Sequence, residues 1–194
     1  NERPDGDRLR GNLRSPHRAH LTLPLLAADA IAADHVLFVP AGCNPQKMDR
    51  RPTSGQHRIA MLEAALAGDS RASVSSIEVD REGATYMVDT LRQLRAMERW
   101  QGVRLRLLIG ADQALNFRTW KAWEEIVTLA EPLIMPRGDQ DVKTLLEALR
   151  GLFPEDPETW CGRVLDLPRR SDRSEEIRSD LSEEIPLEDQ LTPE

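Results

Sequence analysis

The sequence has few cysteines, a shortage of basic charge and no long apolar run. Cys43 and Cys161 are its only cysteines. Neither has a partner at metal-ligand spacing, so a zinc cluster or a disulfide framework has no support. No apolar run approaches the roughly 20 residues that cross a bilayer, and the charged residues 1–10 do not resemble a signal peptide. We therefore expect a cytoplasmic protein with no membrane partner and no resident metal cluster.

The shortage of basic charge bears on the class of partner. The chain has 26 Lys and Arg against 33 Asp and Glu, which gives a formal net charge of −7. This balance argues against nucleic acid as a partner, because that binding depends on clustered cations that meet phosphates. A small anionic substrate is compatible with it, since a few local cations suffice, and nothing in the sequence specifies an oligomeric state.

The hydrophobic pattern predicts one domain of the α/β class. The length of 194 residues and an apolar content of 40% suit a single globular domain with its own core. Strand-like apolar runs alternate with segments of helical period, which is typical of a parallel sheet flanked by helices. The predicted strands are 35–40, 72–79, 104–109, 132–135 and 163–167, and the predicted helices are 21–33, 58–67, 87–97, 121–129 and 142–149.

Two histidines near the start of the first predicted helix form the first candidate site. His17 and His20 are three residues apart, so on a helix their rings share one face near the N-terminus, where backbone N–H groups favour an anion. Two imidazoles there can bind a triphosphate. The alternative is a pair of exposed histidines in an ordinary first turn.

Two cations follow the apolar run 36–39. Lys47 lies in a loop after this strand, at the carboxyl edge of the sheet, where open α/β sheets bind ligands. It can meet a phosphate there or remain a solvated lysine. Arg58 has the same two possibilities, because it can also pair with a carboxylate on its own helix.

A small-residue turn after the strand 104–109 carries an acidic side chain. Gly110 and Ala111 let the backbone approach a ligand and leave Asp112 at a helix entrance, where an N-cap role is the alternative to ligand binding. Trp120 and Trp123 are three residues apart, which predicts one aromatic face on a helix. That face either packs into the core or stacks on a heteroaromatic ring.

The order of these motifs along the chain carries a resemblance. The series comprises His-x-x-His at 17–20, Val-Leu-Phe-Val-Pro-Ala-Gly at 36–42 with Lys47, Arg58 before Ile-Ala-Met-Leu, Gly-Ala-Thr-Tyr-Met-Val-Asp-Thr-Leu at 83–91, Leu-Ile-Gly-Ala-Asp at 108–112, Trp120, Met-Pro-Arg-Gly at 135–138 and Ser-Glu-Glu-Ile-Arg at 174–178. It closely resembles the bacterial nicotinate-nucleotide adenylyltransferases, over residues 17–194. Each motif is modest alone, but the ordered set is specific.

The resemblance implies a Rossmann-like nucleotidyltransferase fold. The implied reaction joins ATP to nicotinate mononucleotide, gives deamido-NAD and pyrophosphate in NAD biosynthesis, and uses Mg²⁺ that arrives with ATP. The motif matches assign His17, His20, Lys47 and Arg178 to the phosphates and the leaving pyrophosphate, and Arg58, Thr85, Tyr86, Asp112, Trp120, Arg137 and Ser174 to substrate binding. No protein nucleophile is needed, because the phosphate of the mononucleotide attacks the α-phosphorus of ATP directly.

Two other functions stay open. A related adenylyl- or cytidylyltransferase could use another acceptor, such as pantetheine phosphate, although Tyr86, Asp112 and Trp120 match the dinucleotide-forming branch. A non-catalytic nucleotide-binding remnant is the other alternative. It is motivated by Met87, where the family has Thr, and by the loss of the family's glycine-rich motif before His17. A further departure is Arg173-Ser174-Glu175, where the family has Ser-Ser-Thr.

The N-terminus departs most from the family. Residues 10–15 read Arg-Gly-Asn-Leu-Arg-Ser where the family has Gly-Gly-Thr-Phe-Asp-Pro. We therefore expect 1–16 to be an aberrant segment that is poorly ordered or misplaced and that weakens ATP binding. The nucleotidyltransferase domain 17–194 follows it, with a tail that is acidic from about residue 179.

The genetic code permits an origin for this departure. If the codons for residues 5–16 are read one base later, Arg-Gly can encode Gly-Gly, Asn-Leu can encode Thr-Phe and Arg-Ser can encode Asp-Pro. Our hypothesis is that 1–16 is a frameshifted translation of the glycine-rich motif. Resequencing tests it, and a clean read that encodes Arg-Leu-Arg-Gly-Asn-Leu would end the idea.

Overall fold

The computed structural model describes residues 5–9, 18–42, 54–136 and 141–167, with only the backbone for 5–9 and 18–20. Five parallel strands form one sheet in the order β3 (Ala72–Val74), β2 (His35–Phe38), β1 (Asp5–Leu9), β4 (Arg104–Gly110) and β5 (Glu131–Met135). The order reverses between β1 and β4, and ligands of open α/β sheets bind at such a reversal, outside the carboxyl ends of the strands. The parallel α/β sheet confirms the predicted fold class.

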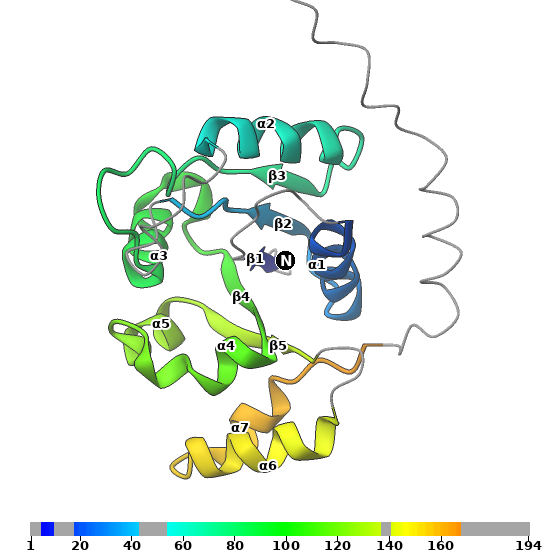
Figure 1. Ribbon diagram of the computed structural model, residues 1–194, viewed down its shortest axis with the longest axis vertical. Coiled ribbons are helices and arrows are strands. Elements are labelled where there is room, and N and C mark those ends of the chain that lie inside the picture. The colour runs from blue at the N-terminus through cyan, green and yellow to red at the C-terminus, as the bar shows by residue number, and fades with distance from the viewer. Residues whose placement is uncertain (1–4, 10–17, 43–53, 137–140, 168–194) are drawn as a thin grey trace, which may run out of the picture.

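Helices cover both faces of this sheet (Figure 1). The helices are α1 (Arg18–Ala30), α2 (Gly55–Leu66), α3 (Met87–Ala96), α4 (Ala111–Leu115), α5 (Trp123–Leu129), α6 (Val142–Leu152) and α7 (Pro157–Gly162), with 3₁₀ turns η1 (Glu98–Trp100) and η2 (Phe117–Thr119). Figure 1 shows α1 on one side of the sheet and α3 and α5 on the other. In the part of the chain that is described, no helix is long and apolar enough to cross a membrane.

The core alternates between the two faces along each strand, as the period of a strand requires. On β4, Leu107 and Ile109 pack with the residues of α3 and α5, whereas Leu108 packs with α1. All three are fully buried, and each buried aliphatic side chain stabilises the fold by about 1.5–3 kcal/mol.

The N-terminal strand corrects one expectation. We expected 1–16 to be poorly ordered or misplaced, but Asp5–Leu9 forms β1 at the centre of the sheet, with Gly6 in register with His35 of β2 and Leu105 of β4. The backbone explains this placement, since ladder hydrogen bonds to two flanking strands depend on main-chain groups rather than on a side-chain pattern. Residues 1–4 and 10–16 lie outside the described part of the chain.

Two predicted strands are shorter than expected. The strand expected over 72–79 ends at Val74, because the chain then turns and the Asp80 N–H donates to the Ser76 carbonyl at 2.9 Å. The strand expected over 163–167 is reduced to one parallel bridge between Val164 and Ile134. The α7 helix just before this bridge, which was not predicted, leaves little chain for a longer strand.

Candidate functional site

The segments after β2 and before α3 meet at the carboxyl edge of the sheet. Gly42 lies four residues past the end of β2, and a Cβ at this position would overlap the carbonyl oxygen of Glu78 and lie 2.7 Å from Cγ2 of Thr85. Only a glycine permits this close approach. It brings the Thr85–Tyr86 segment, predicted from its motif, against the end of β2.

A buried hydrogen-bond network lies behind this segment. Thr90 of α3 is fully buried, and its hydroxyl donates to Oε1 of Glu78 at 2.9 Å. Arg81 donates to the same hydroxyl oxygen through Nη1 at 3.1 Å and to Oε1 of Gln93 through Nη2 at 2.7 Å. The Thr90 hydroxyl also lies 3.3 Å from the carbonyl oxygen of Tyr86. One hydroxyl therefore joins α3, the loop before it and the buried carboxylate.

Glu78 is the unusual member of this network. Its side chain is fully buried, and among the described residues Oε2 has no hydrogen-bond partner. The carboxylate is compensated by Arg81 only through the Thr90 hydroxyl. Sequence analysis missed Glu78, Arg81 and Thr90, although an acidic residue between the apolar Ile77 and Val79 is a signal of a buried carboxylate that needs a hydrogen-bond partner.

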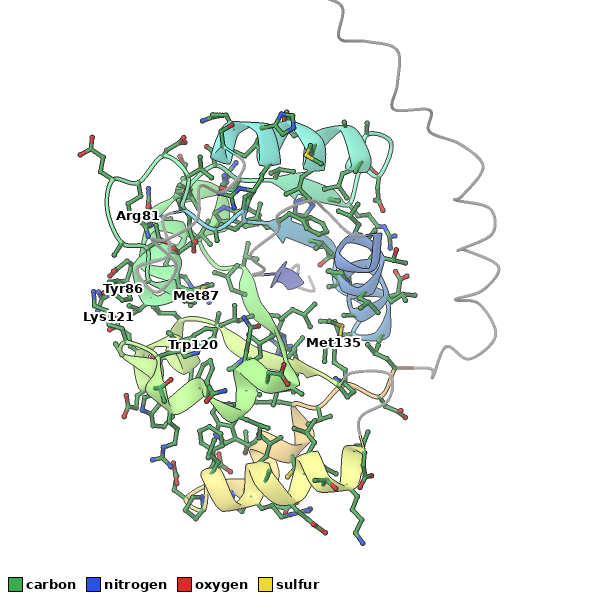
Figure 2. All side chains as sticks on the ribbon, in the orientation of Figure 1. Arg81, Tyr86, Met87, Trp120, Lys121 and Met135 are labelled. Atoms are coloured by element: carbon green, nitrogen blue, oxygen red, sulfur yellow. The ribbon has the colours of Figure 1, made fainter. Side chains whose placement is uncertain are left out.

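Tyr86 and Lys121 form a cation–aromatic contact at the surface. Tyr86 precedes α3 and is 38% exposed, the one exposed large hydrophobic side chain among the described residues. Nζ of Lys121 lies 4.3 Å from the centre of its ring and 3.2 Å from Oδ2 of Asp89. Figure 2 shows Tyr86 and Lys121 side by side, with Met87 and Trp120 in the same region.

The two tryptophans do not form one helical face, so that prediction was wrong. Trp120 follows η2 and packs on Phe117 with ring centres 5.0 Å apart, whereas Trp123 begins α5 and contacts Phe153 at 5.9 Å. The backbone of Ala122 has a φ of 51°, which breaks the helix between them. Trp120 is only half-buried, so core packing accounts for part of its surface.

Asp112 lies in the first turn of α4 and is exposed. The N-cap is Gly110, whose N–H donates to the Gln113 side chain at 3.2 Å, so the N-cap interpretation of Asp112 was wrong. A carboxylate in a first turn is favoured by the helix dipole. Asp112 therefore stands at the carboxyl end of β4, at the edge where the ligand crevice is expected.

Met87 has a packing role. It is 2% exposed and belongs to the core beneath α3 with Val88 and Leu91. A threonine there would place a hydroxyl in an apolar environment of this protein. The departure from the family at this position therefore fills the core rather than supplying a donor to a ligand.

Arg58 is a buried cation with an open donor. It lies in the second turn of α2, which begins with Ser54 as N-cap, where the side-chain oxygen accepts from the N–H of His57 at 3.2 Å. Its side chain is 5% exposed, and Nε has no hydrogen-bond partner among the described residues. Burial lowers the pKa of Arg58, but a guanidinium stays charged at neutral pH. The structure shows no ion pair for Arg58 within the described part of α2, so pairing on its own helix is not supported.

The remaining predicted residues divide into two groups. His20 lies in the first turn of α1, with its backbone described. Residues His17, Lys47, Arg137, Ser174 and Arg178 lie outside the described residues. The start of α1 follows β1, so His20 belongs to the same carboxyl edge as Gly42 and Asp112.

A separate pocket of about 320 Å³ opens beside the second half of α3. Its lining includes Ser75, Asp80, Gln93 and Arg99, together with the outer side of Arg81, and none of the predicted site residues that are described. Arg81 thus has the pocket on one side and the buried network on the other.

Comparison of the sequence with known proteins gives consistent findings. The sequence profile of the cytidylyltransferase-like family matches residues 11–179. A protein of Neisseria meningitidis serogroup C / serotype 2a, named "Probable nicotinate-nucleotide adenylyltransferase", is 33% identical over 166 residues, which cover 86% of this chain and 81% of the relative. A protein of the same name from Mycolicibacterium smegmatis is 32% identical over 173 residues, with coverage of 88% and 78%.

Comparison with solved structures concerns the fold. The nicotinic acid mononucleotide adenylyltransferase of Plasmodium falciparum, complexed with NaAD, has a TM-score of 0.61 at 16% identity and covers 75% of this chain and 71% of its own. Its complex with APC gives a TM-score of 0.59. At this identity the similarity extends to the sheet and its helices, and it agrees with the Rossmann-like architecture.

Proposed function

We propose that this chain transfers the adenylyl group of ATP to nicotinate mononucleotide, because it belongs to the nicotinate-nucleotide adenylyltransferase family. The products are deamido-NAD and pyrophosphate, and the reaction is a step of NAD biosynthesis. Both substrates and both products are small anions, which a few local cations can bind despite the net charge of −7. We place the reaction in the cytoplasm, where ATP is available.

One structural observation supports this proposal above the others. The motif segments after β2, before α3 and after β4 converge at the carboxyl edge of a doubly wound sheet, through the contact of Gly42 with Thr85 and through the position of α4. That edge, next to the reversal of strand order between β1 and β4, is where such folds bind nucleotides.

The reaction needs positioning and charge rather than a nucleophile from the protein. The mononucleotide phosphate attacks the α-phosphorus of ATP in line, and pyrophosphate leaves with negative charge that cations stabilise. We assign that stabilisation to His17, His20, Lys47 and Arg178, with Ser174 in the same phosphate-binding turn as Arg178.

The substrate-binding residues hold the two nucleotides in line. Thr85, Tyr86 and Trp120 are placed around the nicotinate nucleotide or the adenosine, together with Asp112 and with Arg137 nearby. Arg58 is assigned to a substrate phosphate on its motif match; its Nε is buried without a hydrogen-bond partner among the described residues, so this binding requires the side chain to turn toward the substrate. These assignments put flat side chains at the rings and cations at the phosphates.

Magnesium belongs to the proposed reaction as a companion of ATP. The donor chemistry fits this: exposed Asp112 is a hard oxygen donor at the carboxyl edge, and Mg²⁺ bound to a nucleotide needs only one or two carboxylates and keeps several waters. When bound, it neutralises charge on the triphosphate. The protein residues orient the two nucleotides around it.

Pyrophosphate release tests the proposal directly. The assay contains ATP and Mg²⁺ with nicotinate mononucleotide, and a parallel assay contains nicotinamide mononucleotide. It is run on this chain and on a variant with the glycine-rich motif restored by Arg10→Gly, Asn12→Thr, Leu13→Phe, Arg14→Asp and Ser15→Pro. We expect the restored variant to turn over at least about 100-fold faster, since a set of backbone donors to a phosphate is worth that much.

The outcomes separate the candidate functions. Turnover by the restored variant alone supports the reaction and agrees with the frameshift hypothesis. Equal turnover by both chains supports the reaction and contradicts the importance of residues 10–15. Turnover by neither contradicts the proposal and favours a non-catalytic nucleotide-binding protein.

A further inference from the structure

Lys121 is a neighbour in sequence of Trp120 and a neighbour in space of Tyr86, the two aromatic residues of the proposed mononucleotide site. It directly follows Trp120 in the turn before α5, and its ammonium lies 4.3 Å from the ring centre of Tyr86 at the start of α3. Figure 2 shows the three side chains on one side of the molecule. The positive charge is therefore located where two segments distant in the sequence come together.

The surroundings leave this charge partly available. Lys121 Nζ lies 3.2 Å from Oδ2 of Asp89, but the other oxygen of Asp89 accepts from Nη1 of Arg92 at 2.9 Å. Arg92 also pairs with Glu125 through two hydrogen bonds of 2.7 and 2.5 Å. Asp89 is thus shared between two cations. The Lys121 side chain is 51% exposed, so its ammonium can turn toward a second anion.

Tyr86 is the aromatic neighbour of this cation. One face of its ring carries the ammonium, and the side chain is exposed, whereas the other large apolar side chains among the described residues are buried or half-buried. An aromatic side chain left at the surface beside a cation suits a ligand with a flat ring and an anionic substituent. Nicotinate has this combination, and nicotinamide lacks the anionic group.

From this juxtaposition we infer that Lys121 is a specificity-determining residue that selects nicotinate mononucleotide over nicotinamide mononucleotide. The inference rests on the proposed function and refines it. The Lys121 ammonium attracts the ring carboxylate of the acid, whereas the neutral carboxamide gains nothing from the charge. Asp89 moderates the selection, because it competes with the carboxylate for the same ammonium.

Binding measurements without ATP test the inference independently of the phosphate-binding residues. Each mononucleotide is titrated by calorimetry into the full chain, into Lys121→Met and into Lys121→Arg, with circular dichroism as a check on folding. We expect Lys121→Met to weaken the acid about ten-fold, which is about 1.4 kcal/mol, and to leave the amide nearly unchanged. Lys121→Arg keeps the charge and should retain most of the preference.

Two further variants sharpen the result. Asp89→Asn removes the competing charge, so the preference for the acid should rise instead of fall. Lys143→Met removes an exposed lysine on α6, remote from Tyr86, and should leave both affinities unchanged. Opposite shifts in Lys121→Met and Asp89→Asn would support the inference, because a merely structural contact predicts a loss in both.

Two other outcomes would contradict the inference. If Lys121→Met weakens both mononucleotides equally, Lys121 does not select the acid and the inference is overturned while the proposed function stands. If neither the parent chain nor the variant with the restored glycine-rich motif binds either mononucleotide, the proposed function fails and the inference fails with it.

Discussion

The side of the sheet that carries α3 and α5 differs from the side that carries α1 and α2 in how it contributes to the site. On the α3 side, a buried network around Thr90 and a close contact at Gly42 fix the loop with Tyr86. On the α1 side, the described candidate residues are His20 and Arg58, each near the start of a helix. The contacts on the α3 side fix the position of a loop with an exposed aromatic ring, whereas the α1 side presents the starts of two helices.

The two cores also differ in the side chains that fill them. The core beneath α3 contains large aromatic side chains, with Phe153 stacked on Trp160 at a centre distance of 3.6 Å. The core beneath α1 contains the small residues Ala27 and Ala28, which let the helix lie close to the sheet. The aromatic side chains fill one core, whereas Ala27 and Ala28 let the C-terminal end of α1 lie close to the sheet on the other side.

Gly42→Ala is expected to have the largest effect, because it strikes the contact that fixes the α3 side. The added methyl group would overlap the Glu78 carbonyl and crowd Thr85, and such overpacking costs about 1–3 kcal/mol. Urea unfolding measures the loss, and binding of nicotinate mononucleotide should fall with it. The matched control is Gly151→Ala in α6, where a Cβ meets nothing within 4 Å. It should instead stabilise the chain by about 0.5–1 kcal/mol.

Thr90→Val should have the next largest effect. It keeps the shape of the side chain but leaves Glu78 and Arg81 without their shared hydroxyl, at a cost of about 1–3 kcal/mol for the buried unsatisfied group. KM for the mononucleotide should rise more than KM for ATP, which steady-state kinetics of a turnover-competent chain would measure. Thr90→Ser restores the hydroxyl and should recover most of the loss. An equal rise of both KM values would contradict a role confined to the α3 side.

Arg58→Met tests the contribution of the α1 side of the sheet. Replacing a buried, incompletely paired cation by an apolar side chain of similar length should leave the free energy of unfolding unchanged or raise it. KM for ATP should nevertheless rise about ten-fold if Arg58 holds a phosphate, as expected for a lost charge-assisted hydrogen bond. Arg58→Lys should lie between the two. A variant that loses stability but keeps its KM would show that Arg58 is structural.

The smallest effect is expected at the amino edge of the sheet. His35 of β2 is half-buried, and burial, together with the nearby Arg99, lowers its pKa below 6.5, while Asp69 opposes the shift. The unfolded chain therefore binds more protons in mildly acidic solution. The contribution of His35 to stability is present above about pH 6.5 and is lost as the pH falls toward the lowered pKa. Thermal unfolding from about pH 8 to about pH 5 checks this. His35→Gln should flatten this part of the profile without changing nucleotide binding.

Local pattern was enough to predict much of the fold. The apolar run 36–39 and the run ending at Ile109 predicted β2 and β4, because strands buried on both faces are apolar throughout. The spacing of Val88, Leu91 and Leu94 predicted α3, and all three are buried. These elements are decided by burial of their own side chains, which a sequence displays directly.

Other features depend on partners that are distant in the sequence. β1 is held by backbone hydrogen bonds to β2 and β4, so its side chains gave no signal. The separation of Trp120 from Trp123 depends on the left-handed backbone of Ala122, which the spacing of the tryptophans does not reveal. Asp112 lies in the first turn of α4 and not at its N-cap, because Gly110 is the N-cap of that helix.

The candidate site likewise combines features that the sequence reveals with features that depend on tertiary contacts. The sequence by itself determined the family and the α/β class, and it named Thr85, Tyr86 and Trp120 as candidate site residues, since ordered motifs and hydrophobic period are one-dimensional properties. Only the tertiary structure decided that a buried hydroxyl joins Glu78 to the loop before α3, and that Lys121 lies over Tyr86. These contacts arise where separate segments meet at one sheet edge, and their energies depend on burial and distance, which no local pattern specifies.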